Sequence, residues 1–164
     1  MVRPRRLVLT VAGLVAAVLL VRAEVAEPVR VSSDSMSPTL RNGDHVVLEK
    51  VTVTLDGVRR GQLVAFASPE DGALVLKRVV GVGGDTVEIR DALLYVSGRP
   101  VVEPGIDVAS IDGTYFGPVT VGEGQVFVLG DNRANSVDSR AYGLLPVGLV
   151  IGRVLRPLEA HWRG

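Results

Sequence analysis

Apolar and polar residues alternate in short runs along most of the chain beyond residue 30, and Gly, Pro, Asn and Asp separate the runs. A period of two is typical of strands with one buried face, and the turn formers mark where strands end. No segment after residue 30 keeps helical spacing over ten or more residues. The pattern predicts a mainly β domain, with strands at His45–Val51, Gln62–Ala67, Leu74–Val82, Asp85–Arg90, Leu93–Val96 and Gln125–Leu129.

The first 22 residues break this pattern, because Leu7–Val21 carries no charge and has an arginine at each end. A helix of these 15 residues is about 22 Å long, against roughly 30 Å of hydrocarbon, a shortfall that arginine snorkelling and local thinning make up. We predict a transmembrane anchor over 7–22 and a cytoplasmic basic tail over 1–6, which places the rest outside the cell membrane. The alternatives are a buried core helix and a cleaved secretory signal, against which Arg22 argues.

Charge and composition narrow the functional classes. The chain has 18 basic and 18 acidic side chains, and its first 22 residues hold four of the basic ones and no acidic one. The body is therefore mildly acidic, so we expect no nucleic-acid partner. The absence of cysteine excludes disulfides, a thiol nucleophile and cysteine-ligated metals, and two histidines, His45 and His161, do not make a histidine-rich metal centre.

The composition also divides the chain along its length. Residues 23–30 are polar and are predicted to be a linker to a domain over 31–157, with 158–164 as a tail. Within the domain, Val101–Val121 is rich in turn formers, which indicates a flap or small insertion.

Three polar segments interrupt the strands: Val31–Leu40 (VSSDSMSPTL), Leu76–Asp85 (LKRVVGVGGD) and Leu129–Arg140 (LGDNRANSVDSR). Taken singly, the first is typical of a loop, and the third is an Asx-rich loop that lacks the spacing and closing glutamate of a calcium loop. The second places Lys77 beside Arg78 on a strand, so one cation faces an apolar layer unless the strand lies at a sheet edge.

Together these segments resemble the motifs of type I signal peptidases, the membrane-bound Ser/Lys proteases of protein export. The matching stretches are Ser33–Leu40, Lys77–Asp85 and Gly130–Arg140, in the order that the family has them, and the resemblance covers residues 31 to about 157. It implies a signal-peptidase-like coiled β-sheet catalytic domain behind one N-terminal transmembrane helix. The short span between the last two motifs implies that the family's accessory β region is reduced to about 91–121.

The resemblance also implies the roles of individual side chains. Ser35 is expected to be the nucleophile and Lys77 its general base. Ser33 is expected to be an oxyanion-hole donor, and Ser136 the partner that orients the Lys77 amine. Asp138 and Arg140 are expected to form a supporting ion pair, and Met36 and Leu76 to be part of the substrate pocket. A free lysine has a pKa of about 10.4 and is almost wholly protonated at pH 7. Lys77 therefore needs a lowered pKa, which burial among its valine and leucine neighbours supplies.

The implied activity is removal of N-terminal signal peptides from exported preproteins after small residues, with preproteins and the lipid bilayer as partners and no metal or cofactor. Two alternatives stay open. A dedicated or inactive membrane-tethered paralogue that binds peptides fits departures such as Ala134, where an acid is common. A repressor-type self-cleaving Ser/Lys protease would carry a DNA-binding helix-turn-helix in place of residues 1–30. A Ser-His-Asp triad through Asp44 and His45 is not expected, because neighbouring strand residues face opposite ways.

Overall fold

The computed structural model describes residues 25–50, 57–103, 105–106 and 115–155. The predicted anchor over 7–22 and His161 lie outside the described residues. Within the described ranges, no helix is long and apolar enough to span a bilayer.

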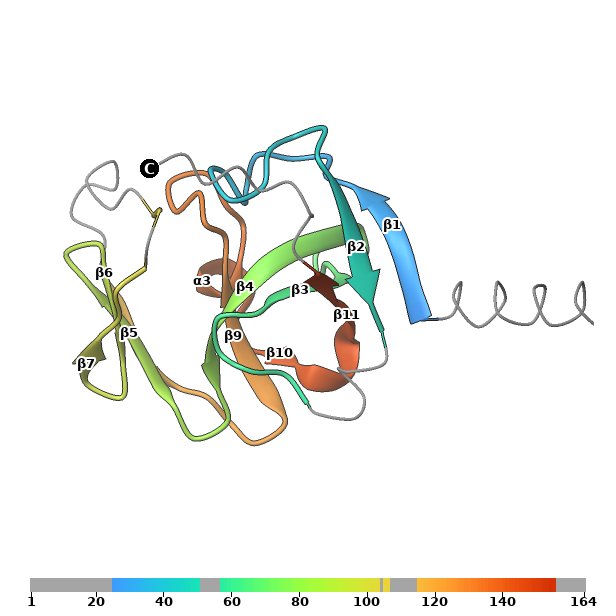
Figure 1. Ribbon diagram of the computed structural model, residues 1–164. Helices are drawn as coiled ribbons and strands as arrows, with labels where there is room; N and C mark the ends of the chain where they lie inside the picture. The colour runs from blue at the N-terminus through green and yellow to red at the C-terminus, as the bar shows by residue number, and fades with distance from the viewer. Residues whose placement is uncertain (1–24, 51–56, 104, 107–114, 156–164) are drawn as a thin grey trace, which may run out of the picture.

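The described residues form two antiparallel sheets, shown in Figure 1, which confirms the prediction of a mainly β domain. The larger sheet has the order β1 (Ala26–Arg30), β2 (His45–Glu49), β11 (Val150–Leu155), β3 (Leu63–Ala67), β4 (Leu74–Val82), β9 (Gln125–Leu129) and β10 (Leu145–Pro146). The smaller sheet has the order β7 (Arg99–Pro100), β6 (Leu93–Val96), β5 (Thr86–Arg90) and β8 (Phe116–Thr120). The helical elements in these ranges are short: α3 (Ser139–Tyr142) and a 3₁₀ turn, η2 (Val147–Leu149).

All six strands expected from the sequence are present, with ends that differ by up to two residues. The linker prediction is wrong for the last part of 23–30, because β1 pairs with β2 from Ala26 opposite Glu49 to Arg30 opposite His45. Most of β1 is exposed on the edge of the sheet, so it has no apolar alternation that would mark it as a strand.

The accessory region is a sheet of its own and begins earlier than expected. It starts at β5, and the stretch expected to be a flap supplies β8, which pairs with β5 on its outer side. Gly117 and Pro118 lie within β8, and these residues are tolerated on an edge strand, so the segment has the composition of a turn.

One apolar cluster joins the two sheets. Val80, Phe127 and Leu129 of the larger sheet pack with residues of the smaller sheet such as Val87. Gly81 permits this close approach, since a Cβ atom there would lie 2.5 Å from Cγ2 of Val87. The two sheets therefore share a core, and the smaller one cannot shift without disturbing β4.

The strand β4 is internal to the larger sheet. It pairs with β3 on one side, where Val64 lies opposite Lys77, and with β9 on the other, where Leu129 lies opposite Arg78. The alternative of a solvated lysine on an edge strand is therefore excluded. Lys77 is 3% exposed.

The core packing gives a first prediction. Phe66 is fully buried and its ring contacts Tyr142, with centroids 6.4 Å apart. We expect Phe66→Ala to lower the free energy of unfolding by about 3–5 kcal/mol, because the cavity loses both transfer free energy and packing contacts. Urea unfolding followed by circular dichroism measures the change. Val102, 89% exposed, provides the control: Val102→Ala should change stability by less than about 0.5 kcal/mol. Similar losses in both variants would contradict the assigned core.

Candidate active site

Ser35 lies in the loop that joins β1 to β2. The loop is closed at its base by a hydrogen bond from the Val31 N–H to the Asp44 carbonyl oxygen at 2.8 Å. Met36 and Leu40 are 1% and 2% exposed and pack in an apolar cluster beneath the loop. These buried side chains hold the loop in place directly after Ser35, whose own side chain stays partly accessible.

The Lys77 amine meets the Ser35 hydroxyl. Lys77 Nζ lies 2.7 Å from Ser35 Oγ, and Ser33 Oγ lies 3.3 Å from the same oxygen. When the amine is charged it donates this hydrogen bond, and when it is neutral the hydroxyl donates to its lone pair. The sequence prediction that these side chains share one site therefore agrees with the geometry.

The surroundings of Lys77 lower its pKa. Burial is the largest cause, since it disfavours the charged amine. The carboxylates of Asp138 and Asp131 act in the opposite direction, and the guanidinium of Arg140 partly offsets them. The net effect is a pKa below the ordinary lysine value, which raises the fraction of neutral amine near pH 7.

The segment that follows β9, residues 130–136, forms a wall of the site beside Ser35. The Asn132 N–H donates to the Ser35 carbonyl oxygen at 3.0 Å, and Asn132 Nδ2 donates to the Asp34 carbonyl oxygen at 3.1 Å. A Cβ atom on Gly130 would lie 2.6 Å from the Ser35 carbonyl oxygen and 2.2 Å from Ser136 Oγ, so only glycine fits there. This wall thus fixes the backbone of Ser35.

Ser136 lies beside Gly130, on the side where the Ser35 carbonyl oxygen also approaches that glycine. Its Oγ is buried and has no hydrogen-bond partner among the described residues, Lys77 included. The structure therefore brings Ser136 to the site but does not contain the expected bond to the Lys77 amine.

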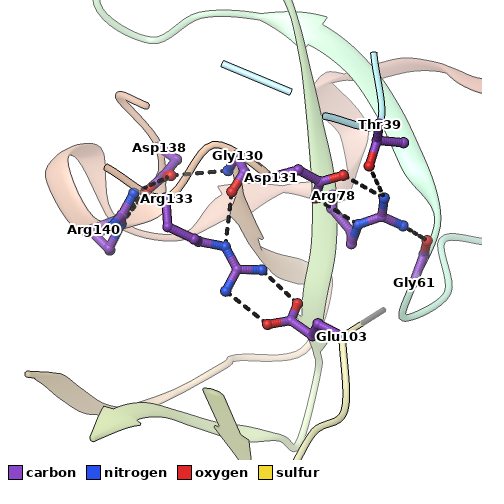
Figure 2. A network of polar contacts seen from close by, with 9 residues as sticks. All are labelled: Thr39, Gly61, Arg78, Glu103, Gly130, Asp131, Arg133, Asp138 and Arg140. Carbon is purple, nitrogen blue, oxygen red and sulfur yellow. Dashed lines mark hydrogen bonds and ion pairs between the residues drawn. The ribbon is translucent and has the colours of Figure 1, made fainter. Parts of the chain in front are cut away.

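An ion pair ties the second polar segment to the third. The Arg78 guanidinium bonds both oxygens of Asp131, with Nε–Oδ1 at 2.8 Å and Nη2–Oδ2 at 2.6 Å (Figure 2). It also donates to the Gly61 carbonyl oxygen at 3.0 Å. The hydrogen bonds to Asp131 raise the pKa of Arg78 above its usual value, so the pair stays charged.

A second ion pair lies within the third segment. Arg140 bonds both oxygens of Asp138, through Nε and Nη2 at 2.8 Å each, and the Gly130 N–H donates to Asp138 Oδ2 at 3.0 Å (Figure 2). Burial by itself raises the pKa of Asp138, but these hydrogen bonds outweigh it and hold the pKa below the usual value. The expected pair is therefore present, and it fixes Gly130.

A small cavity adjoins Ser35. It is lined by residues 29–33, 35–36 and 74–76, which include both predicted pocket residues, Met36 and Leu76. His45 is exposed on β2. The described residues contain no group of three side chains suited to hold a metal ion.

Sequence reasoning missed several side chains that shape the site. Asn132, Gly130 and the Arg78–Asp131 pair lie in the recognised motifs, so their position in the motifs was the available signal. Glu103, which pairs with Arg133, lies outside every motif, and nothing local in the sequence distinguishes it.

The chain is similar in sequence and in structure to known proteins of one family. The profile of the family described as signal peptidase, peptidase S26, matches residues 4–158. The probable signal peptidase I-1 of Synechocystis sp. is 40% identical over 147 residues, which cover 84% of this chain and 73% of that protein. Signal peptidase I of Bacillus licheniformis is 38% identical, with 82% of this chain and 77% of that protein covered. The crystal structure of a signal peptidase I from Enterococcus faecalis V583 matches with a TM-score of 0.54 and 37% identity, over 60% of this chain and 96% of that chain.

The environment of Lys77 gives a second prediction. The chain has two lysines, Lys50 and Lys77, so NMR of ¹³C-labelled lysine should show two side-chain signals. We expect the Lys77 signal to titrate below the ordinary lysine pKa of about 10.4, because burial disfavours the ammonium form. Lys50→Arg leaves a single signal and assigns it. A Lys77 titration at or above the ordinary value would contradict the described burial.

Proposed function

The chain belongs to the signal peptidase family, peptidase S26, and from this premise we propose that it is a serine endopeptidase that removes N-terminal signal peptides from exported preproteins, with Ser35 as nucleophile and Lys77 as general base. The observation that carries the proposal is the 2.7 Å contact between Lys77 Nζ and Ser35 Oγ. A buried amine with a lowered pKa is the environment in which lysine can accept a proton near neutral pH.

Acylation begins when Ser35 Oγ attacks the scissile carbonyl carbon and its proton passes to Lys77 Nζ. The negative charge that develops on the carbonyl oxygen is stabilised by the Ser35 backbone N–H and by the Ser33 hydroxyl. The position of Ser33 Oγ, 3.3 Å from Ser35 Oγ, supports this assignment. As the tetrahedral intermediate collapses, the Lys77 ammonium gives its proton to the leaving amine, and an ester to Ser35 remains.

Deacylation uses the same groups. The neutral Lys77 amine takes a proton from a water molecule, and the hydroxide attacks the ester carbonyl. The second intermediate collapses with return of the proton to Ser35 Oγ, which releases the carboxyl end of the signal peptide. The enzyme is thereby restored without a metal ion or cofactor.

Ser136 supports the base in this proposal. Its buried hydroxyl, which is without a partner among the described residues, lies beside Gly130 and has a free acceptor to offer the Lys77 amine. The Asp138–Arg140 pair holds Gly130 in place and acts on structure more than on chemistry.

The cavity beside Ser35 sets the substrate preference in this proposal. The buried side chains of Met36 and Leu76 line this small cavity, which suits a small residue such as alanine in the substrate. An extended segment of the preprotein would lie between residues 29–33 and 74–76. The apolar stretch over 7–22 would anchor the enzyme in the cell membrane and keep the site on its outer face.

The dyad gives a third prediction, measured as cleavage of a preprotein with an Ala-x-Ala site by the full chain in detergent. Ser35→Ala and Lys77→Ala should each reduce cleavage below detection while the fold is kept. Lys77→Arg should be equally inactive, because a guanidinium does not give up its proton. Lys50→Arg is the matched control, since Lys50 forms a surface pair with Glu27, and it should keep full activity. Substantial cleavage by Lys77→Arg would rule out the general-base role.

The pH profile gives a fourth prediction. Because the neutral amine is the active form, kcat/KM should rise with pH and level off above the folded-state pKa of Lys77. That pKa is lowered, so the midpoint should lie below the ordinary lysine value and should coincide with the NMR titration of Lys77. Lys50→Arg should not move the midpoint. A profile that is flat across the Lys77 titration would contradict the assignment.

A further inference from the structure

A third ion pair reaches the active-site wall from the smaller sheet. Arg133 Nη1 donates to Glu103 Oε2 at 2.8 Å, and Nη2 donates to Glu103 Oε1 at 2.5 Å. Figure 2 shows the Arg133 guanidinium between the two other pairs, aimed away from them at Glu103. The side chains of Arg133 and Glu103 are 3% and 9% exposed, so the pair is almost wholly shielded from water.

Glu103 is held by the smaller sheet. It comes two residues after Val101, whose N–H donates to the Leu94 carbonyl oxygen of β6 at 2.9 Å and extends the pairing of β6 with β7. The Glu103 carbonyl oxygen accepts from the Ile106 N–H at 3.2 Å, which forms a turn. The Glu103 carboxylate therefore extends from a hydrogen-bonded segment that directly follows β7 of the smaller sheet.

Arg133 leads from that carboxylate to the nucleophile. Its Nε donates to the Gly130 carbonyl oxygen at 2.9 Å, which closes the loop between these residues. Asn132, inside this loop, bonds the carbonyl oxygens of Asp34 and Ser35. A shift of Arg133 thus displaces the group that fixes the Ser35 backbone.

Stability alone does not require such a pair. Desolvation of two buried charges costs about as much as their attraction returns, and apolar residues of similar volume are often as stable. What the pair does supply is direction, because a guanidinium bonded through both arms and through Nε has one orientation. The Glu103 carboxylate also acts on Arg78, whose pKa is raised chiefly by its hydrogen bonds to Asp131 and further by Glu103.

We propose that Glu103 is a positioning residue for the peptidase reaction, through which the smaller sheet sets the alignment of Ser35 by way of Arg133 and Asn132. This inference rests on the proposed function for its kinetic consequence. Its structural consequence, a tightly held Asn132 N–H, does not depend on which substrate is cut.

The test compares Glu103→Ala with Glu88→Ala in the full chain in detergent. Glu88 is the matched control, because it also pairs with an arginine, but its partner Arg90 lies on the same strand, β5, and the side chains of Arg90 and Glu88 are 52% and 22% exposed. We expect Glu103→Ala to lower kcat about 10- to 100-fold with KM unchanged within about twofold, since misalignment of the nucleophile affects the chemical step. The amide hydrogen of Asn132 should exchange about tenfold faster, and Glu88→Ala should change neither quantity.

Removal of one partner leaves a buried charge unpaired, so a second variant separates alignment from folding. Glu103→Leu combined with Arg133→Met replaces the pair by apolar side chains and should recover the melting temperature of the wild type. If kcat stays at least tenfold low and Asn132 exchange stays fast at that temperature, the positioning role holds. If kcat returns with the melting temperature, the pair is structural only and the proposal is overturned.

The two readouts also separate this inference from the proposed function. Failure of the wild type to cleave any preprotein would count against the proposed function, whereas Asn132 exchange would still test the structural link from Glu103 to the Ser35 backbone. Unchanged exchange in Glu103→Ala overturns the inference even if cleavage by the wild type is efficient. Faster exchange with unchanged kcat overturns it as well.

Discussion

The contact between the buried Lys77 amine and the Ser35 hydroxyl is the interaction on which the rest of the structure depends. Burial in an apolar interior disfavours the charged amine. The lysine keeps a lowered pKa only where no carboxylate pairs with it directly and stabilises the ammonium form. An internal strand supplies the burial, since β4 is covered on both edges by β3 and β9. The loop that carries Ser35 must then come to that strand, and its buried Met36 and Leu40 hold it there.

The arginines near the site are ion-paired, and in this they differ from Lys77. Arg78, Arg133 and Arg140 each bond both oxygens of one carboxylate, so their charges are permanent and compensated. Lys77 has no ion pair with a described residue, and its closest polar contact is the Ser35 hydroxyl. This division matches the chemistry of the two side chains, because guanidinium keeps its proton whereas a buried amine can release it. The paired arginines orient the backbone, whereas Lys77, which has no ion pair among the described residues, can change its protonation state.

The smaller sheet is part of the same arrangement. It shares an apolar cluster with β4 and β9, and it contributes a carboxylate to the wall behind Ser35. A region that looks like an insertion in the sequence is therefore connected to β4 and β9 by packing and to the segment beside Ser35 by an ion pair.

The sequence by itself determined the class of fold and six of the strands, and it singled out Ser35 and Lys77 as the expected catalytic pair. Alternation marks β2, β5 and β6, which are half-buried, whereas β3, β4 and β9 are buried along most of their length and stand out as apolar runs between turn formers. Ser35 and Lys77 stand in long motifs whose order is specific. The tertiary structure decided which strand edges are covered, that residues 26–30 form an edge strand, and that Gly117 and Pro118 lie in a strand rather than a turn. It also decided the pairing of Glu103 with Arg133, 30 residues apart. Edge strands and long-range ion pairs depend on what packs beside them, and local periodicity carries no information about neighbours that are distant along the chain.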